Sequence, residues 1–178
     1  MTKKVSLEAV KALREKTSAS INDCRRALES AGGDEGKALE LLRQRGAAIA
    51  KTRQGRTAAQ GRVEAYVHHD GRLACLVEVD CETDFVARTP EFAQFCKDIA
   101  MQVAAMGPRY IRREDAPNDG ARSIEALQTS CLLEQPFVKD AGVTIGDLLK
   151  ALIAKTGENV VIRRFARFAV GEAAGNAT

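Results

Sequence analysis

The sequence predicts an α+β fold, in which an N-terminal three-helix bundle is followed by an antiparallel sheet with helices packed on one side. Apolar residues recur at helical spacing through residues 6–50 and alternate at strand spacing from residue 63. Two longer helical stretches, a short one between them and a last strand come after the first strands, so strands and helices do not alternate regularly along the chain. With 178 residues, 45% hydrophobic and 29% charged, the chain has the composition of an ordinary globular protein.

Three short helices are expected within residues 6–50. Ser6, Ser20 and Asp34 precede the three apolar stripes, and each has a side-chain oxygen that suits the N-cap position. The stripes are Val10 and Leu13, then Ile21, Cys24, Ala27 and Leu28, and finally Ala38, Leu41, Leu42 and Ile49. The periodicity is lost in the basic stretch 51–61, so we predict a helical domain over residues 1–55 and an α+β core domain over residues 56–178.

A half-buried β-hairpin is the next expected element. Its first strand alternates between two sets of residues, Val63, Ala65 and Val67 in one and Glu64, Tyr66 and His68 in the other. Asp70-Gly71 is a strong turn signal. The return strand places four apolar residues on one face, namely Leu73, Cys75, Val77 and Val79. The hairpin leads directly into the segment 81–87.

The second half of the chain is expected to contain helices and a last strand. Thr89-Pro90-Glu91 is typical of a helix start, and Gly107-Pro108 of a helix end. Residues 109–114 are expected as a short strand, residues 123–133 as a short helix, and a further helix should run from Thr144 to Gly157. In the last strand we expect Val160, Ile162, Ala166 and Phe168 on one side and Val161, Arg163 and Phe165 on the other.

The segment 81–87 (CETDFVA) is expected to be a loop that carries an aromatic residue. Phe85 has two interpretations there. It folds back to pack the next helix on the sheet, or it protrudes together with Asp84 as a wedge that a partner protein receives. The four carboxylates at positions 78, 80, 82 and 84 lack the glycine-bearing arrangement of a Ca²⁺ loop, so we interpret them as a solvated acidic edge.

Charge is distributed unevenly along the chain. Residues 1–62 contain 14 Lys and Arg against 7 Asp and Glu, and the rest contains 13 against 17, which together give the net charge of +3. A basic first part on an acidic core favours an acidic partner, either a nucleic acid or a protein.

The composition also bears on the compartment. No stretch approaches the roughly 18 apolar residues that cross a bilayer, and the N-terminus (MTKK) resembles neither a signal peptide nor a transit peptide. The five cysteines are odd in number and form no CxxC pair, which favours reduced thiols over disulfides or a zinc site. We expect a cytoplasmic protein without a cofactor or a bound metal.

An enzyme active site has little support. His68 and His69 are expected on a strand, where neighbours point to opposite faces, so they should not converge beside Cys75 or Cys81 as a base and nucleophile. Neither GxxxxGK[ST] nor GxGxxG is present, so no nucleotide site is expected in this chain.

RNA binding is the alternative function. Eight basic residues could neutralise phosphates, namely Arg25, Arg26, Arg43, Arg45, Lys51, Arg53, Arg56 and Arg62. The first 65 residues, however, contain no aromatic residue for base stacking and no helix with an outward row of Asn, Gln and Arg.

Four blocks of sequence, in order, resemble the elongation factor Ts family. They are residues 10–17 (VKALREKT) with 23–28 (DCRRAL), residues 78–87 (EVDCETDFVA), residues 133–138 (LEQPFV) and residues 157–161 (GENVV). The resemblance covers nearly the whole chain. It implies a guanine-nucleotide exchange factor for the GTPase elongation factor Tu, which is not an enzyme in the chemical sense. Such a factor favours the empty GTPase, so that GDP leaves.

The resemblance also implies which residues bind the GTPase. The family's N-terminal bundle is similar to a ubiquitin-associated domain and docks on the nucleotide-binding domain of the GTPase. The matching positions in this bundle are Lys11, Arg14, Ile21, Asn22 and Arg25. In the core, the matching wedge is Asp84 and Phe85, flanked by Thr83 and Val86, and it inserts near the Mg²⁺ and phosphate site of the GTPase. The resemblance therefore favours the protruding interpretation of Phe85.

Two departures from the family pattern are visible. The turn at residues 17–22 has serines where the family usually has glycines followed by methionines, so the residues offered to the partner at Ile21 and Asn22 differ. The chain also has room for one core subdomain, whereas longer relatives have two. Short relatives pair as symmetric dimers, which implies a non-covalent homodimer through the sheet, with residues 160–168 as an edge.

Overall fold

The computed structural model describes residues 5–17, 19–117 and 123–172. The chain divides into two compact units. One contains residues 1–55 together with 150–159, and the other contains residues 56–149 and 160–178. Within the described ranges, no helix combines the length and apolar character that crossing a membrane requires.

The first unit contains the predicted three helices, α1 (Leu7–Thr17), α2 (Ile21–Ser30) and α3 (Glu35–Arg53). The predicted caps are present, because Ser6 Oγ accepts from Ala9 N, Ser20 Oγ from Asp23 N and Asp34 Oδ1 from Lys37 N. Six buried residues form the core of this unit, namely Val10, Leu13, Cys24, Ala27, Leu28 and Ala38. Two residues of the predicted stripes, Ile21 and Leu41, are exposed instead.

The second half of α3 packs against a segment from far along the chain. Gly46 is buried, and a Cβ atom there would lie 3.8 Å from both Ala154 Cβ and the Lys150 carbonyl oxygen. Both partners belong to the last turns of α7 (Ile145–Thr156). The small side chains let the two helices approach closely.

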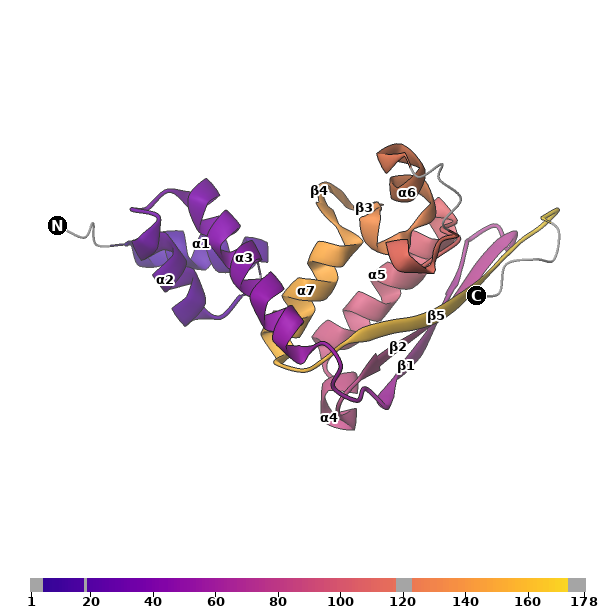
Figure 1. Cartoon of the computed structure of the whole chain (residues 1–178), viewed down its shortest axis with the longest axis horizontal. Helices are drawn as coiled ribbons and strands as arrows, with labels where there is room; N and C mark the ends of the chain where they lie inside the picture. Colours follow the sequence, from indigo (N-terminus) through magenta and orange to yellow (C-terminus); the bar gives the residue numbers. More distant parts are fainter. Residues whose placement is uncertain (1–4, 18, 118–122, 173–178) are drawn as a thin grey trace. The chain divides into compact units, whose positions relative to one another are not determined.

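The second unit is built on a three-stranded antiparallel sheet in the order β1 (Gln60–Val67), β2 (Leu73–Cys81), β5 (Val161–Ala169). The long helix α5 (Pro90–Met106) lies along one side of the sheet (Figure 1). As predicted, Thr89 caps α5, Pro90 opens it, and Gly107 ends it with a positive φ of 55°. The α+β class with helices on one side of the sheet is confirmed.

The two faces of the sheet differ from the expectation for β1. The residues of β2 that face α5, Cys75, Val77 and Val79, are buried as predicted. The apolar residues of β1, however, are on the opposite face, where Val63 and Val67 are 64% and 66% exposed. The register places seven apolar residues on this side, which we call the outer face: Val63, Ala65, Val67, Ala74, Leu76, Ala166 and Phe168.

The predicted faces of β5 were also partly wrong. Ile162 and Phe165 are both buried, although in a regular strand residue i and residue i+3 point to opposite faces. A β-bulge is the reason, since Glu78 pairs with Arg164 while the next residue, Val79, pairs with Ile162. Arg163 is therefore an extra residue in the ladder, and it reverses the alternation of side chains on either side of it.

The second unit also contains the elements that lie between α5 and α7 in the sequence. The predicted short helix is α6 (Ile124–Ser130), and a two-stranded hairpin, β3 (Pro136–Phe137) with β4 (Asp140–Thr144), was not predicted. Residues 109–114 do not form the expected strand, because only Tyr110 makes a single bridge, to Cys131, and a 3-10 turn follows at Arg113–Asp115.

A buried amide pair fastens the hairpin to α5. Gln102 and Gln135 are both fully buried, and Gln102 Nε2 donates to Gln135 Oε1 at 3.1 Å and to the Pro136 carbonyl at 3.1 Å. Gln102 Oε1 accepts from Val138 N at 2.8 Å. Both ends of the Gln102 amide are thus used, as burial of a polar group requires.

Candidate partner-binding site

The segment after β2 is a single helical turn, α4 (Asp84–Ala87), and not the predicted loop. Thr83 caps the turn, with Oγ1 accepting a hydrogen bond from Val86 N at 3.3 Å. The Thr83 carbonyl accepts from Ala87 N, and Cys81 Sγ lies 3.1 Å from the same carbonyl oxygen as a donor. Thr83 is a preferred N-cap residue, so the local sequence favours this turn.

Phe85 protrudes from the turn. Its side chain is 78% exposed, whereas Val86 and Ala87 are only 7% and 9% exposed. The interpretation in which Phe85 packs back onto the sheet is therefore wrong. The buried Val86 and Ala87 fix the turn to the core, so Phe85 is directed outward by its position on the helix rather than by a contact of its own.

Charges flank the exposed aromatic ring. Asp84 is exposed and pairs with Arg88 Nη2 at 3.0 Å, one helical turn later. Exposed pairs of this kind contribute little to stability, so Asp84 remains accessible to a partner at small cost. We use the name wedge for Asp84 and Phe85 from here on.

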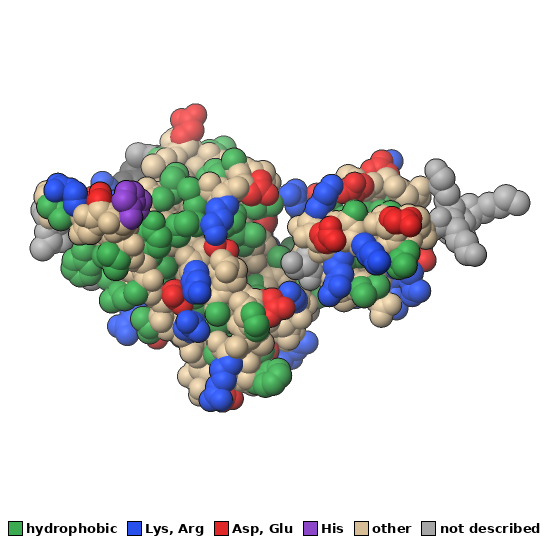
Figure 2. Space-filling model, turned by 180° about the vertical axis from the view of Figure 1, so that it is seen from behind, with side chains coloured by type: hydrophobic (Ala, Val, Ile, Leu, Met, Phe, Trp, Pro, Cys, Tyr) green, Lys and Arg blue, Asp and Glu red, His purple; other side chains and the backbone are tan. Residues whose placement is uncertain are grey.

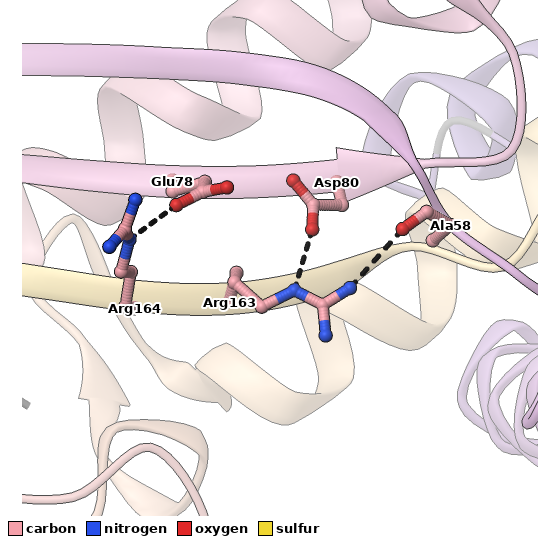
Figure 3. A network of polar contacts seen from close by, with 5 residues as sticks. All are labelled: Ala58, Glu78, Asp80, Arg163 and Arg164. Atoms are coloured by element: carbon pink, nitrogen blue, oxygen red, sulfur yellow. Dashed lines mark hydrogen bonds and ion pairs between the residues drawn. The ribbon is translucent and has the colours of Figure 1, made fainter.

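The acidic run before the wedge is not the solvated edge that was predicted. Asp80 is only 8% exposed, and Arg163 Nε donates to its Oδ2 at 2.7 Å. Arg164 pairs with Glu78 on the neighbouring rung, as Figure 3 shows. Arg56 pairs with Glu82 at 3.5 Å. Each carboxylate of the run thus has an arginine partner, since Asp84 pairs with Arg88.

These arginines were missed as part of the site. Arg163 and Arg164 follow an apolar run in the last strand, and two of the four acids, Glu78 and Asp80, lie near the end of the other strand of the pair. Alternating acids in one strand and adjacent arginines in another are a signal for cross-strand pairing, but the partner strand is not known without the sheet order. In the described ranges, no three His, Cys, Asp or Glu side chains are grouped so that they could hold a metal ion.

A glycine lets the strands approach at this end of the sheet. Gly61 on β1 pairs with Asp80 on β2. A Cβ atom on Gly61 would lie 2.3 Å from the Val79 carbonyl oxygen, which is closer than any real contact. A side chain at this position would push β1 away from the strand that leads into α4.

The candidate residues of the first unit lie on two helices. Lys11 and Arg14 are on α1, and Ile21, Asn22 and Arg25 are at the start of α2. All five are exposed, and Ile21 is 54% exposed although it is apolar. Ser18, within the turn between the two helices, lies outside the described residues.

Several of the basic residues considered for RNA binding pair with carboxylates. Arg45 contacts Asp23 at 2.9 Å, and Arg25 contacts Glu29 at 3.9 Å. Arg56 and Arg62 pair with Glu82 and Glu64. Their charge is thus partly balanced within the chain, which weakens the argument for a phosphate-binding surface.

The histidines are placed differently from the prediction. β1 ends at Val67, so His68 and His69 lie beyond the strand, and their ring centroids are 4.3 Å apart. The expectation that they cannot converge is therefore wrong. Tyr66 Oη lies 3.0 Å from His68 Nδ1, on the partly buried side of β1.

Two of the cysteines, Cys75 and Cys96, are unsuited to act as nucleophiles. All five are free and buried. Burial raises the pKa of Cys75 to about 12, although the Arg167 charge opposes the shift. Burial likewise raises the pKa of Cys96 to about 12. Thiols with such pKa values stay protonated at neutral pH and are poor nucleophiles.

Comparison with known proteins assigns the family. The family model described as elongation factor TS matches residues 3–130. Elongation factor Ts of Carboxydothermus hydrogenoformans is 48% identical over 94% of this chain and 90% of that protein. The Caldanaerobacter subterraneus protein of the same name is 47% identical over 94% of this chain and 98% of its own length, and that of Methylacidiphilum infernorum is 43% identical over 97% and 98%. The chain belongs to the elongation factor Ts family.

Proposed function

We propose that the chain accelerates the release of GDP from elongation factor Tu, with Phe85 inserted as a wedge into the GTPase. The observation that carries this proposal is an aromatic side chain, 78% exposed, on a helical turn whose next two residues are buried. An exposed aromatic residue on a rigid support has the character of a binding hot spot. Phe85 is therefore presented to a partner without any need to refold the turn.

The proposed mechanism is differential binding. A wedge that fits the empty GTPase better than the GDP-bound one lowers the affinity for GDP by the same factor by which GDP lowers the affinity for the wedge. No covalent step is required of this chain, which acts as an exchange factor and not as a chemical catalyst. Val86 supports the wedge from the core, and Thr83 fixes the turn as its N-cap.

The first unit supplies the second contact of the proposal. Its exposed positions Lys11, Arg14 and Arg25 offer positive charge, and Ile21 offers an apolar side chain beside Asn22. Basic residues on an exposed helical surface favour association with an acidic protein and increase the rate of encounter. This contact would hold the factor on the GTPase while the wedge acts.

The test is the release of a fluorescent GDP from purified elongation factor Tu, followed by stopped flow. We expect fast release with the wild-type chain and at least tenfold slower release with Phe85→Ala, about 1.4 kcal/mol of lost coupling. Ile124→Ala is the matched control, since Ile124 is an apolar residue of α6 that is 70% exposed. It should release GDP as fast as the wild type.

The other outcomes contradict parts of the proposal. GDP release that is equally fast with the wild type and with Phe85→Ala would support the exchange function and reject the role of Phe85 as a wedge. No acceleration by the wild-type chain would reject exchange altogether. In that case RNA binding should be tested by its steep loss of affinity with salt.

We also propose that two copies of the chain associate through their outer faces. Val63, Val67, Leu76 and Phe168 are between 48% and 66% exposed there, and Val170 follows them at 62%. Figure 2 shows hydrophobic side chains over a broad area next to the histidines of the β1–β2 turn. Contiguous apolar surface of this kind is uncommon on monomers. The charged residues that the register places on the same side, Glu78 and Arg164, pair with each other. The apolar part of the face is therefore suited to pairing with its own copy around a two-fold axis.

A further inference from the structure

Arg163 joins three segments of the second unit that are far apart in sequence. Its Nε donates to Asp80 Oδ2 at 2.7 Å, and its Nη2 donates to the Ala58 carbonyl at 3.2 Å (Figure 3). Ala58 lies just before β1, and Asp80 is the last residue but one of β2. Both are buried, at 7% and 8% exposure.

The bulge in β5 is what directs Arg163 to these partners. The ladder passes from the pair Glu78–Arg164 directly to the pair Val79–Ile162, so Arg163 has no partner residue of its own. Bulges commonly change the direction of a side chain next to a functional site. The planar guanidinium can then bind a carboxylate and a carbonyl at the same time, which a lysine ammonium cannot do with fixed geometry.

The segment that Arg163 holds is the base of the wedge. Asp80 precedes Cys81, the last residue of β2, and Cys81 Sγ donates to the carbonyl of Thr83, the cap of α4. On the other side of Asp80, the absence of a side chain on Gly61 allows β1 to approach closely. The strand end that leads into α4 is therefore held between β1 and β5.

We propose that Arg163 is a positioning residue for the wedge, which it holds in its productive orientation through the carboxylate of Asp80. This inference rests on the proposed exchange function and adds to it a residue outside the four sequence blocks that resemble the family. Arg163 does not touch the GTPase in this proposal. Without the contact between Arg163 and Asp80, Phe85 would still be exposed, but its side chain would be held less firmly in the orientation that fits the GTPase. A small misplacement of a binding side chain is enough to reduce its contribution to GDP release.

A positioning role predicts which kinetic parameter changes. The contacts of the first unit and the chemistry of Phe85 are unaltered in an Arg163 variant, so the concentration of factor giving half-maximal release should stay near that of the wild type. The maximal rate of GDP release should fall, since it depends on how well the wedge fits the empty GTPase. A residue that bound the GTPase directly would instead raise the half-maximal concentration.

The variants are Arg163→Met and Arg163→Lys, with Lys139→Met as the matched control. Lys139 pairs with Asp98 at 2.7 Å, the same distance as in the Arg163–Asp80 pair. The two basic side chains are 50% and 51% exposed, and their acidic partners 18% and 12%. We expect a maximal rate roughly threefold to tenfold lower for Arg163→Met, a partial recovery for Arg163→Lys, and an unchanged rate for Lys139→Met.

A double-mutant cycle with Phe85→Ala separates positioning from loss of stability. If Arg163 acts through the wedge, adding Arg163→Met to Phe85→Ala should slow release no further. Circular dichroism melting of all variants shows whether each chain is folded at the assay temperature. Full additivity of the two substitutions would overturn the inference, as would a raised half-maximal concentration with an unchanged maximal rate.

The failure of this inference and the failure of the exchange proposal give different results. Fast release by the wild type, slow release by Phe85→Ala and unchanged release by Arg163→Met would retain the exchange function and reject the role of Arg163. No acceleration by the wild type would reject both.

Discussion

Cys75 on β2 and Cys96 on α5 lie on the facing sides of the sheet and of the helix that covers it, and both are buried. In that environment a thiolate would lose its hydration, so the protonated thiol is strongly preferred and the pKa of each rises to about 12. These residues act as small apolar side chains in the core. Their sulfur chemistry is suppressed by their location and not by their sequence context.

The raised pKa values predict loss of stability in alkaline solution. Between the ordinary thiol pKa of 9.0 and about 12, an unfolded chain ionises these thiols while the folded chain keeps them protonated. The unfolded state then binds fewer protons, so the free energy of unfolding falls as pH rises, by up to about 1.4 kcal/mol per pH unit for each thiol. Urea titrations at pH 8.5, 9.5 and 10.5 measure this slope.

The control for this prediction is the double variant Cys75→Ala with Cys96→Ala. It should be less stable at pH 8.5, because the cavities cost packing, but its free energy of unfolding should fall less steeply with pH. An equal slope in the two proteins would show that other groups cause the alkaline loss.

On the scale of elements, α4 is a helix of one turn. Because so short a helix has few hydrogen bonds of its own, its N-cap contributes a large fraction of its local stability. Thr83 Oγ1 accepts a hydrogen bond from the Val86 N–H, which adds a side-chain contact to the few backbone hydrogen bonds that close the turn. Thr83→Ala removes the acceptor and should cost about 1 kcal/mol locally. We expect faster hydrogen exchange at Val86 and Ala87 together with slower GDP release.

The conservative variant Thr83→Ser keeps an oxygen at the cap and should preserve both properties. The midpoint of global unfolding should change by much less than the local opening, because α4 is a peripheral element. Unchanged exchange at Val86 in Thr83→Ala would show that burial of Val86 alone maintains the turn.

The same scale shows what the sequence could predict. Helix ends that depend on local chemistry, such as the caps at Ser20, Asp34 and Thr89 and the glycine at position 107, were predicted correctly. These features are decided by residues three or four positions apart, which a sequence displays directly.

Features that depend on contacts between distant segments were not predicted, although the hairpin of the neighbouring strands β1 and β2 was. The alternation in β1 indicated two faces, but it could not show that the apolar one would be exposed, since that depends on which side α5 covers. The bulge at Arg163 arises from pairing between β2 and β5, which are about eighty residues apart in sequence, as the span of 83 residues between Asp80 and Arg163 shows. For the wedge, the family resemblance favoured protrusion of Phe85, but the helical turn beneath it and the arginine partners of the acids required the structure.

On the scale of the whole molecule, the outer face predicts association. Leu76→Glu places a charge at the centre of this face, where burial in a dimer would leave it unpaired and cost several kcal/mol. We expect the wild type to sediment as a dimer at micromolar concentration and Leu76→Glu to sediment as a monomer.

Val138→Glu is the matched control, because Val138 is 47% exposed and Leu76 is 48% exposed. Val138 follows β3 and lies away from the sheet formed by β1, β2 and β5, so its substitution should leave the mass unchanged. A wild-type chain that remains monomeric up to tens of micromolar would contradict the proposed association.

The division of the chain has a consequence for its own synthesis. Residues 150–159 complete the first unit, and β5, which follows at once, completes the sheet of the second. A ribosome makes these residues after α1, α2 and α3, which emerge earlier and can begin to fold first. Neither unit can finish folding until residues 150–159 and β5 have been made. A chain released before residue 150 lacks the last segment of both units. Truncated products would expose apolar surface in both units at once, which makes them readily distinguished from the finished protein by chaperones and proteases.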